Sequence, residues 1–207
     1  MSEPIPFDAV ILAGGAAERL GGASKPDVEL GGQRLLDRVL VSVSDAREIA
    51  VVGDVEVPVG VHRTLEDPPL GGPVAGVAAG LDVLQSTAPA EWTVLLACDL
   101  ADPLPALGKL VAAWSHAVRN RDIPTDGHDG WCLADSGGHP QWLFGIHRTA
   151  SLRAALARLG SPRDRSMKSL FAESTLVTVP AADDDVADID TWTDHARWVE
   201  RLERTDD

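Results

Sequence analysis

Short apolar runs alternate with amphipathic runs along the first half of the chain. The apolar runs are continuous, which is typical of strands buried on both faces: FDAVILA (7–13), EIAVVG (48–53) and EWTVLLA (91–97). Between and after them lie patterns of helical period, at 34–45, 72–86 and 104–120. This β-α-β-α order predicts an α/β fold with a doubly wound, mostly parallel sheet in three layers, α/β/α.

The alternation of strand-like and helical runs becomes irregular between residues 122 and 140. Turn-forming residues there flank the short strand-like run WCLA (131–134). The run QWLFGIHR (141–148) predicts a further strand. Helical patterns then begin near Thr149 and Arg163, a strand is expected at 175–180, and an amphipathic helix begins near Thr191.

Length and charge narrow the class of protein. A chain of 207 residues suits one α/β domain with a full core. Its 18 Lys and Arg against 32 Asp and Glu give a net charge of −14, so we expect no nucleic-acid or membrane partner, and anionic ligands must be captured locally. The start of the chain lacks a targeting pattern, and Cys98 and Cys132 are too few for a disulfide framework. These features predict a soluble cytoplasmic protein with reduced thiols.

The segment AVILAGGAAERLGGASKP (9–26) carries a strand directly into a glycine-rich loop. Glycines after a strand let backbone N–H groups approach an anion closely and form a cradle. The spacing is neither the G-x-G-x-x-G of a dinucleotide fold nor the G-K-[ST] ending of a P-loop. A dehydrogenase is therefore disfavoured, and a third kind of nucleotide loop is needed.

That loop resembles the signature of nucleotidyltransferases, and specifically of the molybdenum cofactor guanylyltransferase family. The residues that carry the resemblance are Leu12, Ala13, Gly14, Gly15, Arg19, Gly21, Gly22 and Lys25. Further segments resemble the family in the same order: 66–81, 95–105, 139–156, 163–171 and 188–198. The resemblance thus spans nearly the whole chain and implies a Rossmann-like nucleotidyltransferase fold.

The resemblance implies that GMP passes from GTP to the phosphate of molybdopterin (molybdenum cofactor), with release of pyrophosphate. The domain 1–207 would then comprise a nucleotide-binding half at about 1–105 and an acceptor-binding half at about 106–207. The first glycines would accept base and ribose. Arg19 and Lys25 would lie over the triphosphate, which makes them catalytic candidates together with Asp99. The expected nucleotide-binding set is Leu12, Ala13, Gly14, Gly15, Lys25, Asp67 and Asp99.

Carboxylates supply the expected Mg²⁺ site. Asp99 ends the apolar strand at 91–97, and Mg²⁺ is typically held by one or two carboxylates plus substrate phosphates. Asp188 and Asp190 alternate on an expected strand end, so both point the same way and one of them, Asp190 in our prediction, completes the site. Relatives carry proline where this chain has Trp192, and they lack the Ala101-Asp102 insertion, which would reshape the metal-side loop.

The rest of the sequence contains no second group of residues with the spacing of a metal or catalytic site. The six histidines lack zinc-binding spacing, although the family analogy places His139 near the pterin. Arg163, Arg165 and Lys168 form a basic cluster in the segment that resembles the acceptor-phosphate region. We expect Trp142, Trp192 and Trp198 to be packing residues.

Two alternatives stay open at this point. One is a transferase of the same fold that uses CTP or another phosphorylated acceptor, although Leu-Ala-Gly-Gly is the form typical of the guanylyl branch. The other is a nucleotide-binding protein without catalysis, for instance a regulatory partner of cofactor synthesis. The family resemblance also implies transient partners in cofactor synthesis.

Overall fold

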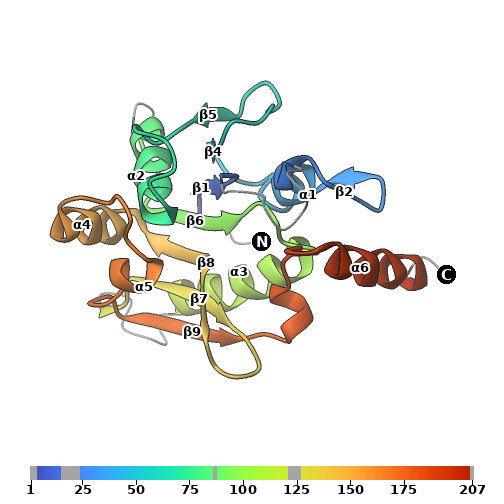
Figure 1. Ribbon diagram of the computed structural model, residues 1–207. Coiled ribbons are helices and arrows are strands. Elements are labelled where there is room, and N and C mark those ends of the chain that lie inside the picture. Colours follow the sequence, from blue (N-terminus) through green and yellow to red (C-terminus); the bar gives the residue numbers. More distant parts are fainter. Residues whose placement is uncertain (1–3, 15–23, 86–87, 121–126, 206–207) are drawn as a thin grey trace.

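The computed structural model describes residues 4–14, 24–85, 88–120 and 127–205 (Figure 1). The strands are β1 (Phe7–Leu12), β2 (Glu29–Leu30), β3 (Gln33–Arg34), β4 (Ile49–Val52), β5 (His62–Thr64), β6 (Trp92–Ala97), β7 (Gly130–Ala134), β8 (Pro140–Arg148) and β9 (Leu176–Pro180). The helices are α1 (Leu35–Ser42), α2 (Pro73–Leu84), α3 (Pro103–Asn120), α4 (Thr149–Leu159), α5 (Met167–Leu170) and α6 (Trp192–Thr205), with 3₁₀ turns η2 (Lys25–Asp27) and η4 (Asp183–Val186). In the described part of the chain, no helix combines the length and apolar character of a membrane span.

A seven-stranded sheet has the order β5-β4-β1-β6-β8-β7-β9. Strands β5, β4, β1 and β6 are parallel. The chain moves outward from β1 to β4 and β5, then returns to the other side of β1 as β6, which creates a topological switch point between β1 and β6. Strand β8 is antiparallel to both neighbours, β6 and β7, whereas β7 and β9 are parallel. The predicted doubly wound, mostly parallel sheet is confirmed, with β8 as its antiparallel member.

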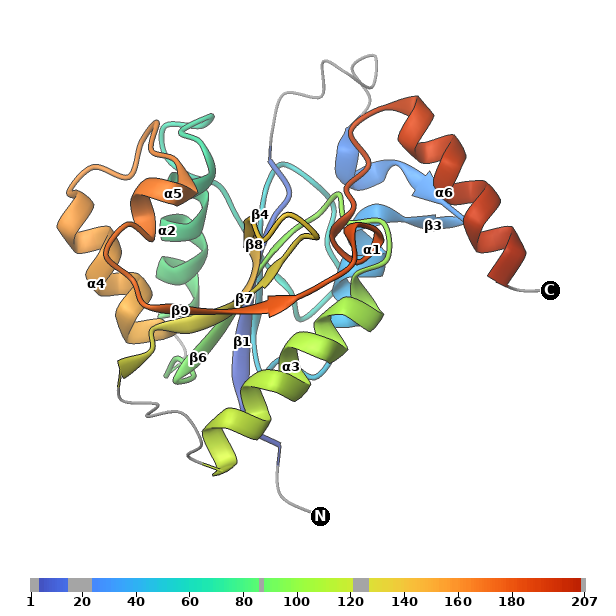
Figure 2. The same ribbon diagram turned by 90° about the horizontal axis from the view of Figure 1, so that it is seen from below.

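Helices cover both faces of this sheet (Figure 2). Helices α1 and α3 pack on one face, over a core that includes Trp92, Trp114 and Trp131. Helices α2, α4 and α5 pack on the other face. The central parallel strands β1, β4 and β6 are therefore buried on both sides, which explains why their sequences are nearly continuous apolar runs rather than alternating ones.

Helix α2 lies unusually close to β1 because two of its residues are glycines four positions apart. A Cβ on Gly80 would stand 2.4 Å from Val10 Cγ1, and a Cβ on Gly76 would stand 3.0 Å from Leu12 Cδ2. Side chains at i and i+4 share one helix face, so the two glycines form a flat strip that rests on the strand. This contact holds the N-terminus of α2 beside the end of β1.

The C-terminal helix packs against the β2–β3 hairpin rather than against the large sheet (Figures 1 and 2). Gly31 and Gly32 have positive φ and form the turn of the hairpin. A ring nitrogen of His195 lies 2.7 Å from the Glu29 carbonyl oxygen. A third apolar cluster fills the space below α6: Val28, Leu30, Leu35, Ala101, Ile189 and Trp198.

One helix boundary differs from the sequence-based prediction. The pattern at Arg163 predicts a helix start there, but α5 begins at Met167. Asp164 has φ of 57°, outside the helical region, so residues 163–166 form a loop. Ser166 then caps α5 by accepting a hydrogen bond from the Ser169 amide at 3.2 Å.

His147 on β8 is buried without a polar partner. Its ring stacks on Phe171 with centroids 4.7 Å apart, and neither ring nitrogen has a hydrogen-bond partner in the described chain. Gly130 and Gly145 leave the space that the ring fills, since a Cβ on either would lie within 2.6 Å of it. Burial lowers the pKa of His147 to about 3, against an ordinary value of 6.5.

This burial predicts a dependence of stability on pH. Between pH 6.5 and 3 the unfolded chain protonates this histidine and the native state does not, so acidification favours unfolding. For one such group, each unit of pH decrease in this range lowers the free energy of unfolding by about 1.4 kcal/mol. His147→Leu should lose that slope in denaturant titrations across this range, and His116→Leu, at an exposed position on α3, should keep it. An unchanged slope in His147→Leu would contradict the assignment.

Candidate active site

The carboxyl ends of β1 and β6 meet at the switch point. Their register runs from Phe7↔Trp92 to Leu12↔Ala97, so Gly14 and Asp99 lie two residues beyond the last pair. The Cys98 amide donates to the Leu12 carbonyl at 3.0 Å and keeps the two strand ends together. In open α/β sheets this crevice is where ligands bind.

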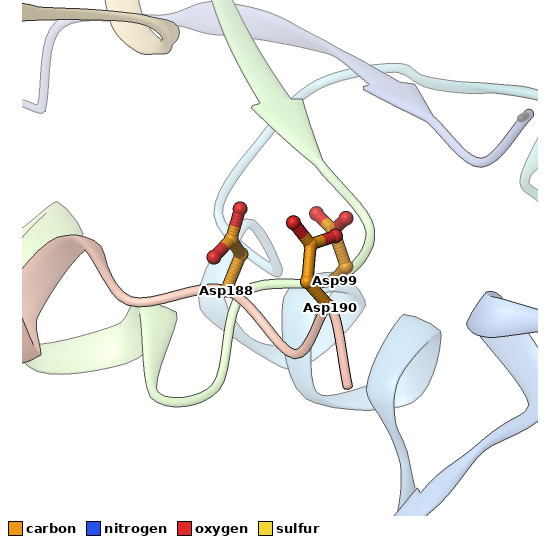
Figure 3. A group of neighbouring side chains, drawn as sticks. All are labelled: Asp99, Asp188 and Asp190. Atoms are coloured by element: carbon orange, nitrogen blue, oxygen red, sulfur yellow. The ribbon is translucent and has the colours of Figure 1, made fainter. Parts of the chain in front are cut away.

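A backbone bridge brings a distant segment to this edge. The Ile189 amide donates to the Asp99 carbonyl at 2.9 Å, and the Ala101 amide donates to the Ala187 carbonyl at 3.0 Å. Ile189 is fully buried, so its neighbours Asp188 and Asp190 face away from the core, toward Asp99 (Figure 3). The predicted strand end is wrong here: the segment lies between η4 and α6 and makes only an isolated bridge, Leu100↔Asp188.

Ala101 and Asp102, which follow β6, are part of this bridge. Ala101 is fully buried, and its carbonyl accepts a hydrogen bond from Arg38 Nε at 2.9 Å. The Asp102 carboxylate lies 3.8 Å from Arg38 Nη2. These two residues thus attach the loop after β6 to α1 on one side and to residues 187–189 on the other.

The three carboxylates form one acidic cluster. Asp99, Asp188 and Asp190 each place an oxygen within 4.8 Å of the other two (Figure 3). Desolvation raises the pKa of Asp188, and the negative charges of Asp190 and Asp99 raise it further. Hard oxygen ligands at this spacing suit Mg²⁺ chemically, and the crowded negative charge favours a cation.

Lys25 lies against this acidic cluster. Its Nζ is 3.0 Å from Asp99 Oδ2 and also contacts Asp190 Oδ1. The lysine precedes Pro26, whose fixed φ suits the start of turn η2 and whose side chain is buried. Partial burial lowers the pKa of Lys25, but the hydrogen bonds and charges of Asp190 and Asp99 outweigh that effect and raise it. The ammonium is therefore charged, with 23% of the side chain exposed.

The expected nucleotide-side residues lie along the same sheet edge. Leu12 ends β1, and Ala13 is buried with its amide donating to the Val52 carbonyl at 2.8 Å, while Gly14 is exposed. Asp67 is exposed on loop 65–72, which follows β5 and leads into α2. Gly15 and Arg19 lie outside the described residues.

Loop 65–72 is attached to loop 163–166. Arg163 Nη1 donates to the Pro68 carbonyl at 3.0 Å, and the Asp164 amide donates to the Gly71 carbonyl at 2.7 Å. Of the predicted basic cluster, Arg163 thus packs on this loop, whereas Arg165 and Lys168 are exposed.

A cavity of about 310 Å³ opens beside the acidic cluster. The paired register of β6 and β8 ends at Leu96↔Phe144, and the two strands diverge beyond it, which leaves the gap. The lining residues come from both strand ends and from the loops above them: Ala97, Asp99, Leu100, Pro140, Gln141, Trp142, Leu143, Phe144, Met167, Val186 and Asp188. The cavity is thus apolar along most of its wall and acidic at one end.

Trp142 forms part of this wall through a column of stacked rings. Its indole stacks on Phe171 with centroids 5.5 Å apart and an interplanar angle of 15°, and Phe171 stacks on His147. Trp142 does pack against the core, as the sequence suggests, but it also lines the cavity. Sequence reasoning missed this second role because it depends on how β8 diverges from β6.

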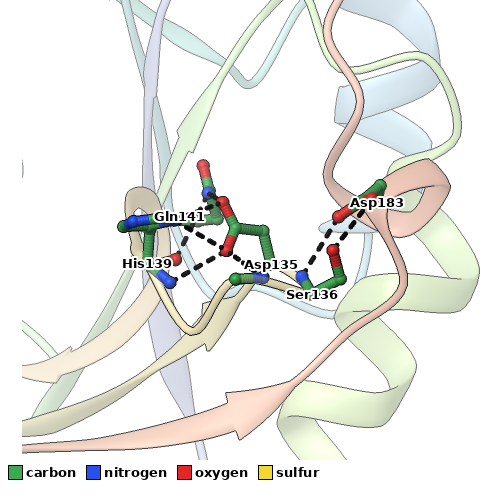
Figure 4. A network of polar contacts seen from close by, with 6 residues as sticks. Asp135, Ser136, His139, Gln141 and Asp183 are labelled. Carbon is green, nitrogen blue, oxygen red and sulfur yellow. Dashed lines mark hydrogen bonds and ion pairs between the residues drawn. The ribbon is translucent and has the colours of Figure 1, made fainter.

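Polar contacts fix the β7–β8 loop at the cavity's rim (Figure 4). Asp135 Oδ1 accepts from the amides of Gly137 and His139 at 2.9 and 2.8 Å. Ser136 donates through its amide and hydroxyl to Asp183, at 3.1 and 3.0 Å. His139 is 80% exposed and lies next to Pro140 and Gln141 of the cavity wall. The loop is thereby held to η4, the turn that precedes Asp188.

The site lies at the switch point of an open α/β sheet and combines an acidic cluster with a paired lysine. These features are typical of α/β proteins that bind a ligand at this sheet edge. Comparison with known proteins makes this class specific: the chain belongs to the family described as the MobA-like NTP transferase domain, whose model matches residues 9–179. The predicted family resemblance is confirmed.

Curated relatives carry the name molybdenum cofactor guanylyltransferase. One from Bradyrhizobium sp. (strain ORS 278) is 33% identical over 144 residues, which are 66% of this chain and 64% of that protein. One from Rhodopseudomonas palustris (strain BisB5) is 40% identical over 98 residues, 44% of this chain and 47% of that protein. The chain thus spans between about half and just under two thirds of the length of these relatives.

Solved structures share the fold. Molybdopterin-guanine dinucleotide biosynthesis protein A from Archaeoglobus fulgidus superposes with a TM-score of 0.66 at 18% identity, over 96% of this chain and all of that chain. 2-C-methyl-D-erythritol 4-phosphate cytidylyltransferase from Thermus thermophilus superposes with a TM-score of 0.61 at 17% identity, over 96% and 99% of the two chains.

The scaffold of the acidic cluster gives a prediction about stability. Ile189 is fully buried below α6 and holds Asp188 and Asp190 in place. Ile189→Ala should lower the free energy of unfolding by about 2–4 kcal/mol, and Ile189→Val by about 1 kcal/mol, in urea titrations. Equal stability of Ile189→Ala and the parent would show that the bridge is not held by this side chain.

Proposed function

We propose that the protein is a nucleotidyltransferase that transfers GMP from GTP to the phosphate of molybdopterin and releases pyrophosphate. The observation that carries the proposal is the meeting of Lys25 with Asp99, Asp188 and Asp190 at the switch point, in a chain of the MobA-like family. Nucleotidyl transfer needs charge neutralisation and alignment more than covalent help from the protein, and this cluster supplies charge of both signs.

The carboxylates of Asp99 and Asp190 are our proposed ligands for Mg²⁺, and Asp188 is placed to join them. When bound, the ion would neutralise charge on the phosphates and orient them. Lys25 offers a compact positive charge to a phosphate oxygen. Leu12, Ala13 and Gly14 would hold the nucleoside, and Asp67 on loop 65–72 would approach it from the side of α2. Gly15 and Arg19 complete the proposal from the sequence alone.

The nucleophile in this proposal comes from the acceptor. A phosphate monoester has its second pKa near 6, so it is largely dianionic at neutral pH and needs no general base. Cys98 is next to Asp99 in sequence, but burial and the charge of Asp99 raise the pKa of its thiol far above neutral, so it stays protonated. The protein's task is then to align two phosphates, and no side chain has to form a bond with either.

The cavity between β6 and β8 is our proposed acceptor site. Its apolar wall suits a planar ring, and its acidic end, formed by Asp99 and Asp188, is where the acceptor phosphate would meet the metal. Trp142, at one end of the Trp142–Phe171–His147 column, lines this volume. A bicyclic heteroaromatic ring would extend the stack by one member.

A nucleotide screen tests the proposed reaction. Purified protein with Mg²⁺ and molybdopterin should release pyrophosphate from GTP, and about 100-fold more slowly from CTP, because a site built for guanine leaves polar groups unpaired with another base. Asp99→Asn should lower the GTP rate by about 100-fold or more, since an amide neutralises no metal charge. Asp102→Asn, which changes a neighbouring carboxylate outside the acidic cluster, is the matched control and should retain the parent rate. Equal rates with GTP and CTP would refute the guanylyl assignment.

Substitution of the cavity wall tests the acceptor site. Trp142→Ala should raise KM for molybdopterin by about 10- to 100-fold, the range expected when one stacking partner is removed. The dissociation constant of GTP, measured by calorimetry without acceptor, should not change. The prediction that Trp192 is a packing residue is wrong, because this side chain is 53% exposed on α6. Trp192→Ala should therefore change neither constant. An unchanged KM in Trp142→Ala would place the acceptor elsewhere.

A further inference from the structure

The ammonium group of Lys25 lies at the position where a metal ion would bind. Its Nζ hydrogen-bonds Asp99 Oδ2 at 3.0 Å and contacts Asp190 Oδ1, the two carboxylates proposed as metal ligands. The side chains of Lys25 and Asp99 are only 23% and 18% exposed, so water screens this ion pair incompletely. Lys25 is therefore the counter-ion of the acidic cluster.

Lysine and metal compete for these oxygens. Mg²⁺ bonds carboxylate oxygens at about 2.0–2.1 Å, well inside the separation of a hydrogen-bonded ammonium. An ion bonded to Asp99 and Asp190 and an ammonium hydrogen-bonded to the same oxygens would repel each other at close range. A free divalent ion must therefore break two charge-assisted hydrogen bonds before it binds.

A nucleoside triphosphate changes this balance. It brings anionic oxygens to which Lys25 can transfer its hydrogen bonds, so the carboxylates are released to the metal without loss of the lysine's charge partners. Metal and nucleotide then bind with positive coupling, and by linkage each raises the affinity of the other by the same factor.

We propose that Lys25 makes the acidic cluster selective for a divalent ion in complex with a nucleoside triphosphate and excludes the free ion. This inference rests on the proposed function, because it takes the triphosphate as the second partner of Lys25. It assigns Lys25 a role in ligand selection in addition to its contact with phosphate. The cavity and the acceptor do not enter the argument.

Binding of Mn²⁺ alone, without nucleotide, tests the proposal. The free-ion electron paramagnetic resonance signal is followed as Mn²⁺ is added to the full-length parent and to Lys25→Met. We expect Lys25→Met to bind one Mn²⁺ at least about 10-fold more tightly than the parent, which corresponds to about 1.4 kcal/mol. Lys25→Arg keeps the positive charge and should retain the weak binding of the parent.

Three controls make each outcome decisive. Lys109→Met removes a lysine that pairs with Asp185 at 2.6 Å, away from the acidic cluster, and should bind Mn²⁺ as the parent does. The double variant Asp99→Asn, Lys25→Met should lose the tight site, which locates the ion at the cluster. Lys25→Gln replaces Lys25→Met if thermal unfolding shows that the methionine variant does not fold.

Equal Mn²⁺ affinity of the parent and Lys25→Met would overturn the proposal, as would a gain in affinity that survives the added Asp99→Asn substitution. Absence of Mn²⁺ binding to Lys25→Met, or to Lys25→Gln where that variant replaces it, would overturn it too. These outcomes are separate from the proposed transfer reaction, which is judged by pyrophosphate release from GTP with acceptor present.

Discussion

Two backbone hydrogen bonds, from Ile189 to Asp99 and from Ala101 to Ala187, place the residues of the site in one location. They connect the carboxyl end of β6 to a segment almost ninety residues later and set the alternation that turns Asp188 and Asp190 toward Asp99. Without this bridge the sheet would present a single carboxylate at its switch point. The burial of Ile189 beneath α6 makes the bridge part of the core, so the packing of the C-terminal helix and the composition of the acidic cluster depend on each other.

The bridge concentrates negative charge in a protein that is already acidic, and positive charge must balance it locally. Lys25 supplies that charge from η2, whose position is set by Pro26 and by the burial of Val28 in the same apolar cluster as Ile189. The cation and the carboxylates are thus positioned by one small core below α6. With three carboxylates against one ammonium, the site keeps an excess of negative charge that favours a cation, and the proposed reaction depends on that cation to receive a phosphate group.

The sequence predicts the parts of this site that follow from strand chemistry. Continuous apolar runs identify β1 and β6, and the residues directly after them, Gly14 and Asp99, must lie at the same sheet edge once the strands are parallel. The approach of Asp188 and Asp190 to Asp99 depends on an isolated bridge, which has no periodic pattern. The sequence therefore pointed to these aspartates but predicted a strand end where the structure has none. The hairpin β2–β3 and strand β5 are too short to give a periodic signal. The cavity depends on where β8, an antiparallel strand, separates from β6. The sequence contains no pattern that predicts where two paired strands separate.

Crystals of the protein grown with GTP and Mn²⁺ would test the central claim most directly, with the ion located by its anomalous scattering. The account predicts one manganese peak bonded to Asp99 and Asp190 and to phosphate oxygens, with Lys25 Nζ moved from the carboxylates onto a phosphate. A manganese peak elsewhere on the surface, or a Lys25 ammonium still bound to Asp99 and Asp190 with GTP in place, would contradict it.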